Sequence, residues 1–318
     1  MTLPVLVIGE ALIDVVHPQD GPVVSYPGGS PANVAITLAR LGHTARLFAW
    51  FGLDAHGQML ADHLHQSGVE LVPGSQDAPR TSTALARLDA TGAAEYEFEI
   101  EWKLPHTKVE EEIAALHIGS IAAVLEPGAT AVAEIVRAKR EDAIITYDPN
   151  MRPLLMGQPE DVRGRVEELV ALSDVVKVSD EDLEWLYPHE SVDAVARRWQ
   201  ALGPAVIVIT RGGTGATAIT ATEHVDVSAP EVVVADTVGA GDSFMGALID
   251  YLARRGLLAR GRRGELDADG GELWATRKAL RAMDAATVRE LLEHAAGVAA
   301  ITVSRPGANP PWLHELSL

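Results

Sequence analysis

Short apolar runs alternate with stretches of helical periodicity along most of the chain. Runs such as Val5–Gly9 and Thr44–Trp50 have the length and composition of buried strands, whereas residues 285–303 repeat apolar positions at helical spacing. Strands separated by helices of about 10 to 15 residues imply right-handed βαβ units. The sequence therefore predicts an α/β fold with a doubly wound, mostly parallel sheet flanked by helices.

The alternation is most regular between residues 113 and 235. Strands are predicted near Leu116–Gly119, Ala143–Tyr147, Val175–Val178 and Val206–Thr210, and helices near Gly128–Arg140, Pro159–Leu172, Glu181–Trp185 and Asp193–Leu202. In open sheets of this kind, ligands bind beyond the carboxyl ends of the strands. The candidate binding segments there are Asp148–Arg152, Lys177–Asp182 and Thr210–Gly215.

Residues 81–88 and 93–100 follow a different pattern, in which apolar and polar positions alternate with a period of two. This pattern around residues 89–92 predicts a β-hairpin. We expect residues 11–30 and 80–104 to form a small β-sheet lid on a single domain that spans residues 1–318. Because an amphipathic hairpin has a second face to bury, we also expect a homodimer through the lid. The polar stretch at about 255–282 is predicted to be a surface insertion.

The chain has 318 residues and a net charge of −19. This charge disfavours nucleic acid and anionic membranes as partners, although a locally positive pocket could still bind a nucleotide. The absence of cysteine excludes disulfides, zinc thiolates and thiol catalysis. The N-terminus lacks the pattern of a signal peptide, and no apolar stretch reaches the roughly 18 residues of a membrane span. We therefore expect a cytoplasmic protein.

The most informative motif is the segment 236–247. It follows an apolar run, Val232–Ala235, that predicts a strand, and it leads into a helix that begins near Asp242. Gly239, Ala240 and Gly241 let backbone N–H groups converge at the helix N-terminus, which is a favourable site for an anion. A carboxylate there suits removal of a proton from a hydroxyl that attacks a phosphate. The alternative is a glycine turn with an Asp N-cap.

A second glycine pair precedes another predicted helix. Ser30 and Pro31 are expected as its N-cap and first-turn proline, so Asn33 projects from the first turn. Gly28 and Gly29 allow close approach of the backbone, and an Asn side chain can both donate to and accept from sugar hydroxyls. Asn33 could instead serve a nearby loop.

Other segments of the sequence give weaker indications of function. Asp14, just past the first predicted strand, is by itself better interpreted as a loop residue. The segment 213–218 superficially fits a dinucleotide fingerprint but leads into a predicted strand at 217–222, whereas that fingerprint must open a helix. The chain contains neither a P-loop nor a His-Glu-x-x-His motif.

The two glycine motifs together resemble the two signatures of the ribokinase-like (phosphofructokinase B type) carbohydrate kinases, which they match in order across essentially the whole chain. The resemblance implies transfer of a phosphoryl group from ATP to a sugar hydroxyl, with Mg²⁺, and a monovalent cation such as K⁺ near Asp236. It implies that Asp242 is the catalytic base and that Gly239, Ala240 and Gly241 form the anion hole. The sugar would be held by Asp14, Gly28, Gly29, Asn33, Phe98 and Arg152, and the nucleotide side lined by Asn150, Lys177, Thr210, Gly212 and Gly215.

One position departs from the family pattern. The family often shows Asn-x-x-Glu near the metal, and the matching residues here are Ser179 and Asp182. Fructokinase-type relatives also have Ser at the first position. The resemblance therefore gives Asp182 an indirect role in Mg²⁺ binding, through water.

The most similar members are bacterial fructokinases, on the segments 116–120, 148–152 and 304–308. The lid segment 96–101 adds Glu97, Glu99 and Glu101 and no Arg, which disfavours an acidic substrate if these residues face the site. They could instead face solvent, with Tyr96 and Phe98 facing the sugar. We therefore expect phosphorylation of fructose at its primary 6-hydroxyl. The alternatives are ribose, a nucleoside or 2-keto-3-deoxygluconate as acceptor, or a catalytically silent sensor of sugar or nucleotide.

Overall fold

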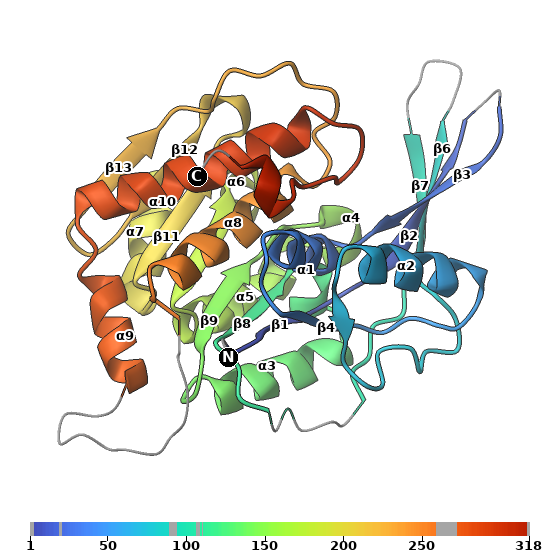
Figure 1. Ribbon diagram of the computed structural model, residues 1–318, viewed down its shortest axis with the longest axis horizontal. Helices are drawn as coiled ribbons and strands as arrows, with labels where there is room; N and C mark the ends of the chain where they lie inside the picture. Colours follow the sequence, from blue (N-terminus) through green and yellow to red (C-terminus); the bar gives the residue numbers. More distant parts are fainter. Residues whose placement is uncertain are drawn as a thin grey trace.

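The computed structural model describes residues 3–18, 21–88, 94–105, 109, 111–258 and 272–316. Within them, a nine-stranded sheet has the order β13-β12-β11-β10-β9-β8-β1-β4-β5 (Figure 1). Its strands are β1 (Val5–Ile8), β4 (Ala45–Phe48), β5 (Glu70–Leu71), β8 (Ala115–Gly119), β9 (Ile144–Asp148), β10 (Val175–Ser179), β11 (Val206–Thr210), β12 (Ala216–Ile219) and β13 (His224–Val227). From β5 at one edge of this sheet to β11, each strand pairs in parallel with its neighbours. At the other edge, β12 pairs antiparallel with β11, and β13 pairs antiparallel with β12.

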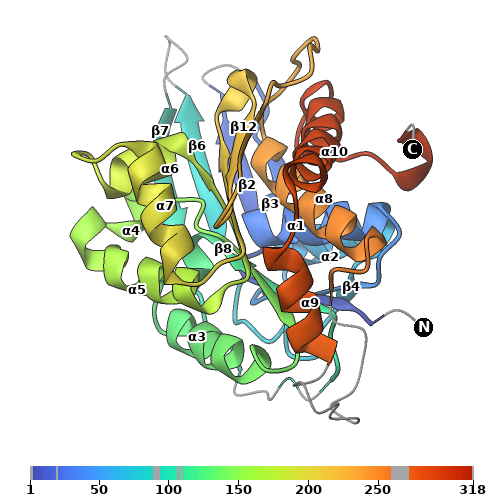
Figure 2. The same ribbon diagram turned by 90° about the vertical axis from the view of Figure 1, so that its left-hand side faces the viewer.

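Helices cover both faces of this sheet (Figure 2). They are α1 (Ser30–Arg40), α2 (Ala55–Gln66), α3 (Gly128–Lys139), α4 (Pro153–Met156), α5 (Pro159–Leu172), α6 (Asp180–Leu186), α7 (Val192–Leu202), α8 (Ala240–Arg254), α9 (Glu272–Arg281) and α10 (Ala285–Val303). Successive strand residues enter opposite cores: Ile144 packs on the side of α1, α8 and α10, and Ile145 on the side of α3, α5 and α7. A strand buried on both faces is the arrangement that an unbroken apolar run predicts, and the predicted fold is confirmed.

A second, four-stranded sheet has the order β3-β2-β6-β7 and projects from the main body (Figure 1). It comprises β2 (Leu12–His17), β3 (Val24–Gly28), β6 (Thr83–Leu88) and β7 (Ala94–Glu99). The antiparallel pairing of β6 with β7 confirms the predicted hairpin, whose turn at 89–93 lies outside the described residues. The sequence suggested that Asp14 is a loop residue after the first strand. In the structure it lies within β2.

Three local predictions need correction. The run Val232–Ala235 forms no strand, because no neighbouring strand covers it and Val233 is 88% exposed. Ser30 is the first residue of α1 and not its N-cap, a position that Gly29 takes. Within the predicted surface insertion at 255–282, residues 272–281 form α9, where Arg277 pairs with the buried Asp174 at 2.7 Å. The remainder of that stretch, residues 259–271, lies outside the described residues.

The helices of the described ranges, 3–258 and 272–316 with their short gaps, include none that is both long enough and apolar enough to span a membrane.

Candidate active site

A cavity of about 550 Å³ lies where the carboxyl ends of β1, β8 and β9 meet the N-termini of α1 and α8 and one face of the small sheet. Its lining includes the predicted sugar-side residues except Gly28, namely Asp14, Gly29, Asn33, Phe98 and Arg152. The predicted catalytic residues Gly239, Gly241 and Asp242 also line it, as does Asn150 from the predicted nucleotide side. The two glycine motifs, about 200 residues apart in the sequence, thus face each other across one pocket.

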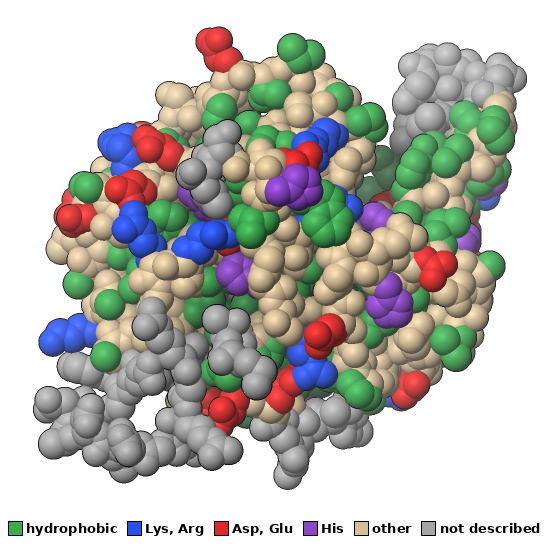
Figure 3. Space-filling view, viewed as in Figure 1, with side chains coloured by type: hydrophobic (Ala, Val, Ile, Leu, Met, Phe, Trp, Pro, Cys, Tyr) green, Lys and Arg blue, Asp and Glu red, His purple; other side chains and the backbone are tan. Residues whose placement is uncertain are grey.

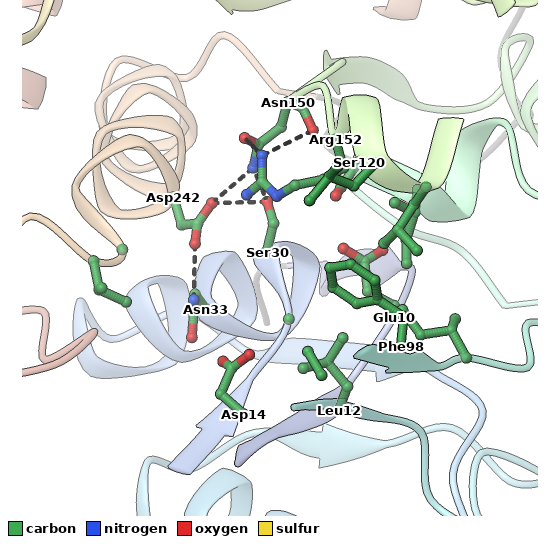
Figure 4. Close-up of a pocket in the computed structure, with 18 of the residues that line it drawn as sticks. Glu10, Leu12, Asp14, Ser30, Asn33, Phe98, Ser120, Asn150, Arg152 and Asp242 are labelled. Carbon is green, nitrogen blue, oxygen red and sulfur yellow. Dashed lines mark hydrogen bonds between the residues drawn. The ribbon is translucent and has the colours of Figure 1, made fainter. Parts of the chain in front are cut away.

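Asp242 lies in the first turn of α8, and three side chains hold its carboxylate (Figure 4). Ser30 Oγ donates to Oδ1 at 2.7 Å, and Asn33 Nδ2 donates to Oδ2 at 2.8 Å. Asn150 Nδ2 donates to Oδ1 at 3.3 Å and also to Ser30 Oγ at 2.7 Å. Asp242 is 7% exposed, and these hydrogen bonds fix the orientation of its carboxylate. A general base needs such a fixed orientation.

The N-terminus of α8 forms the second half of this site. Gly239 is its N-cap with φ 75°, a conformation that L side chains rarely adopt, and an added Cβ would lie 2.6 Å from the Cβ of Ala308. A Cβ on Gly241 would lie 3.3 Å from Lys177 Nζ, so the lysine ammonium is next to the glycine turn. The positive end of the α8 dipole and the Lys177 ammonium therefore both lie at the glycine turn, which favours an anion there; the N–H of Ala240 donates to Thr237 O at 3.2 Å.

Lys177 is paired with Asp148 below the pocket. Its Nζ lies 3.0 Å from Asp148 Oδ2, and the two side chains are 4% and 0% exposed. Burial raises the pKa of Asp148 to about 6, although the adjacent Lys177 lowers it. The partner of Lys177 is thus Asp148, on the neighbouring strand, and not the acidic helix α6 that follows it.

The sugar side is built around Asp14 and Gly29. Asp14 faces the end of β3, where a Cβ on Gly28 would lie 2.2 Å from Asp14 Oδ2. Gly29 has φ 107°, and a Cβ there would lie 2.5 Å from the backbone oxygen of Glu10. Burial raises the pKa of Asp14 to about 6, against the opposing effect of Arg152. Arg152 itself donates from Nη1 to the backbone and side-chain oxygens of Asn150, so its position depends on that residue.

The small sheet turns its aromatic face to the cavity. Tyr96, Phe98 and Ile100 line the pocket, whereas the intervening glutamates are exposed. Glu97 and Glu99 pair with Arg87 and Arg80 at 3.5 and 3.2 Å. The interpretation in which the lid glutamates face the site is therefore wrong, and the alternative in which they face solvent holds. The period-two alternation of a strand places Glu97 and Glu99 on the face opposite Tyr96 and Phe98.

The remaining nucleotide-side residues lie away from this cavity. Thr210 ends β11 and pairs with Ser179 of β10, while Gly212 belongs to a short 3₁₀ turn and Gly215 precedes β12. None of the three lines the pocket. Their nucleotide role stays a prediction.

Asp182 has a local structural role. Its Oδ1 accepts from Met151 N at 2.9 Å and its Oδ2 from Ser179 N at 3.3 Å, and Ser179 Oγ in turn accepts from Asp182 N. The pair is a capping box for α6. Each carboxylate oxygen keeps a further lone pair, so a water-mediated contact with Mg²⁺ is compatible with these bonds.

Asp236 connects the second motif to the C-terminal segment. Its Oδ1 accepts from Val238 N at 3.0 Å and its Oδ2 from Gly307 N at 2.9 Å. These backbone hydrogen bonds, from Val238 and then Gly307, lower the pKa of Asp236.

Several pocket residues were not predicted from the sequence, and those with polar side chains that bear on the site include Glu10, Ser30 and Ser120. Ser30 is inside the first motif but was interpreted as a cap. Glu10 and Ser120 directly follow the apolar runs of β1 and β8, so their position after two adjacent strands is the signal that could have identified them.

Comparison with known proteins agrees with this geometry. The model of the pfkB family carbohydrate kinases matches residues 3–315. This chain belongs to that family. It is therefore an ATP-dependent sugar kinase, and the predicted family and enzyme class are confirmed.

Among curated relatives, fructokinase of Rhizobium leguminosarum bv. trifolii is 33% identical over 277 residues, which are 83% of this chain and 84% of the relative. Fructokinase-1 of Oryza sativa subsp. japonica is 35% identical over 264 residues, 77% of this chain and 81% of the relative. Among solved structures, fructokinase with bound ATP from Xylella fastidiosa has a TM-score of 0.79 at 25% identity and covers 97% of this chain and 94% of its own. Aminoimidazole riboside kinase from Salmonella enterica has a TM-score of 0.75 at 25% identity, covering 96% and 95%.

Proposed function

We propose that this kinase transfers the γ-phosphoryl group of ATP to the primary 6-hydroxyl of fructose. The observation that carries the proposal is the Asp242 carboxylate, held by Ser30, Asn33 and Asn150 at the N-terminus of α8. Relatives named fructokinase over most of the chain support fructose as the acceptor.

In this proposal the 6-hydroxyl of the sugar approaches Asp242, which accepts its proton. The sugar oxygen forms a bond to the γ-phosphorus as the bond from that phosphorus to the β,γ-bridging oxygen breaks, and ADP leaves. The N–H groups of Gly239, Ala240 and Gly241 stabilise the negative charge on the transferring group. Asp14, Gly28, Gly29, Asn33, Phe98 and Arg152 hold the sugar.

Mg²⁺ in kinase sites is bound by one or two carboxylates together with substrate phosphates and water. Among the residues that the structure describes, no group of three or more His, Asp or Glu side chains could hold a metal alone. We therefore propose that Mg²⁺ binds together with the nucleotide phosphates, and that Asp182 contacts it through water. When bound, Mg²⁺ neutralises phosphate charge. We further propose K⁺ near Asp236, whose carboxylate lies beside the turn that precedes the anion hole.

We also propose a homodimer through the small sheet acting as a lid, in a cytoplasmic enzyme. Val24, Val16, Ala86 and Tyr96 are aligned across its four strands by register, on the same face as the pocket-lining Phe98. Val24 and Tyr96 are 36% and 54% exposed, so part of this face is left uncovered. Figure 3 shows hydrophobic side chains along this projecting sheet. A second copy would cover them, and a monomeric mass in solution would contradict the dimer.

One observation favours a second acceptor class. The structural neighbour from Salmonella enterica is a riboside kinase at nearly the same similarity as the fructokinase structure. The deciding experiment measures ATP consumption with fructose, ribose, a nucleoside and 2-keto-3-deoxygluconate. We expect the largest kcat/KM with fructose, and the product to be fructose 6-phosphate. A larger value with another acceptor would reassign the substrate, and no turnover with any of them would contradict the kinase function.

A further inference from the structure

The charged residues that line the pocket are Glu10, Asp14, Asp242 and Arg152. Three carboxyl groups thus face one guanidinium in this part of the described chain. Asp242 serves the phosphoryl-transfer end and Asp14 the predicted sugar side. Glu10 has no part in the transfer step, so its place in the pocket needs a separate explanation.

Glu10 is fixed at the carboxyl edge of the sheet by groups from the short 3₁₀ turn, Ser120–Ala123, that follows the neighbouring strand β8. It follows β1 and is only 6% exposed. Its Oε2 accepts from the backbone N–H of Ala122 at 3.3 Å, and the nearby Ser120 side chain lowers the pKa of the carboxyl group. Figure 4 places Glu10 beside Phe98 and Ser120, across the pocket from Asp242.

This position lies opposite the reacting end of the acceptor. A sugar whose primary hydroxyl is at Asp242 extends its other end toward Glu10, Phe98 and Ser120. We propose that Glu10 makes this end of the pocket select uncharged sugars over those that carry a carboxylate or a phosphate there. The inference rests on the proposed sugar kinase function and identifies the charge class of its substrate.

The charge balance around Glu10 supports this selection. A carboxylate on the substrate would face Glu10 and Asp14, with Arg152 as the one cation among the pocket-lining residues that the structure describes. Because Arg152 is already close to two carboxyl groups, its attraction for a third is largely offset. The lid glutamates add nothing here, since they lie on the other face of the small sheet.

The protonation of Glu10 makes the selection depend on pH. Burial raises the pKa of Glu10 to about 7, and the opposing effects of Ser120, of backbone N–H groups and of Arg152 are smaller. Asp14, with its pKa raised to about 6 by burial, loses its proton first. Repulsion of an anionic sugar should therefore increase as the pH rises through about 7.

The test compares two ligands that differ at one carbon. In 2-keto-D-gluconate a carboxylate replaces the C1 hydroxymethyl group of fructose. Binding of each to the full-length protein is measured by calorimetry, and Glu10→Gln removes the charge while keeping the shape. We expect wild type to prefer fructose. At about pH 8.5, where Glu10 is mostly ionised, Glu10→Gln should reduce the ratio of the two Kd values by roughly ten- to thirtyfold; one like charge several ångströms away at an effective dielectric of about 20 sets the scale, and uptake of a proton by Glu10 sets the upper limit.

The matched control is Glu97→Gln, which removes the same charge from the outer face of the small sheet, and it should leave the ratio unchanged. In wild type, the ratio should rise between about pH 6.5 and about pH 8.5, whereas in Glu10→Gln only the smaller rise that Asp14 contributes below about pH 7 should remain. If the variant does not fold, a wild-type ratio that stays constant over this range would still overturn the proposal.

An unchanged ratio in folded Glu10→Gln, or a wild-type ratio that does not vary with pH, would overturn the proposal. Because both readouts are binding constants, they are separate from the turnover assay. A protein that binds with this selectivity but does not phosphorylate fructose would refute the proposed function and not the role of Glu10.

Discussion

Removing the hydroxyl of Ser30 tests whether the orientation of Asp242 governs catalysis. Ser30 Oγ donates to Asp242 Oδ1 at 2.7 Å and accepts from Asn150 Nδ2 at 2.7 Å. In Ser30→Ala, Oδ1 keeps one longer bond, from Asn150 at 3.3 Å, while Oδ2 keeps its bond from Asn33. The carboxylate therefore loses the shorter of the two bonds that fix Oδ1.

The size of the effect follows from the hydrogen bond that is lost. A hydrogen bond to a charged group contributes about 1.5 to 3 kcal/mol, and about 1.4 kcal/mol corresponds to a factor of ten in rate. Because Asn150 stays near the same oxygen, we expect the lower part of this range, a fall in kcat of about 10- to 50-fold. The Kd for ATP should change much less than kcat, because Asn150 is the one predicted nucleotide-side residue that the structure shows hydrogen-bonded to Ser30.

The assay is steady-state phosphorylation of fructose with a coupled ADP readout, accompanied by thermal unfolding. Ser173→Ala is the matched control, because Ser173 is also a buried helix-end serine, with Oγ bonded to Leu169 O at 2.7 Å, but lies far from the pocket. It should leave kcat unchanged. If Ser30→Ala keeps the wild-type kcat while folded, the hydrogen bonds to Asp242 do not position a catalytic base.

Two further predictions concern the scaffold. Burial alone would raise the pKa of Asp250, but hydrogen bonds from His294, His43 and Arg254 lower that pKa overall. The ionised Asp250 therefore stabilises the folded state above the usual Asp pKa, and this stabilisation is lost as the pH falls below that value. Asp250→Asn should reduce the free energy of unfolding by about 3 to 5 kcal/mol at neutral pH, measured in urea, with a smaller deficit in acid; equal stability at neutral pH would contradict this account. Gly29→Ala should weaken fructose binding, because its Cβ would lie 2.5 Å from Glu10 O at φ 107°; calorimetry that finds wild-type affinity would show that the loop can relax.

Much of the fold could be predicted from the sequence because its patterns are local. The helices Pro159–Leu172 and Ala285–Val303 and the strand Val206–Thr210 have the bounds that apolar periodicity indicated. The run Val232–Ala235 failed because an apolar run becomes a strand only when a neighbouring strand pairs with it, and that is a property of the tertiary structure.

The site residues that belong to the two glycine motifs could be predicted from the sequence. Asn33 and Asp242 are within hydrogen-bonding distance, as the paired motifs suggested. Glu10 and Ser120 could not be ranked, because a polar residue after an apolar run has no signature until the strand order makes β1 and β8 neighbours. The direction of Glu97 and Glu99 likewise depended on which face of the small sheet covers the pocket.

The most direct test of the central claim compares wild type with Asp242→Asn on fructose and ATP, with turnover and fructose binding measured on the same preparations. The account predicts formation of fructose 6-phosphate by wild type and loss of turnover in Asp242→Asn with fructose binding retained. An Asp242→Asn variant that still phosphorylates fructose at the wild-type rate would contradict the assignment of Asp242 as the base.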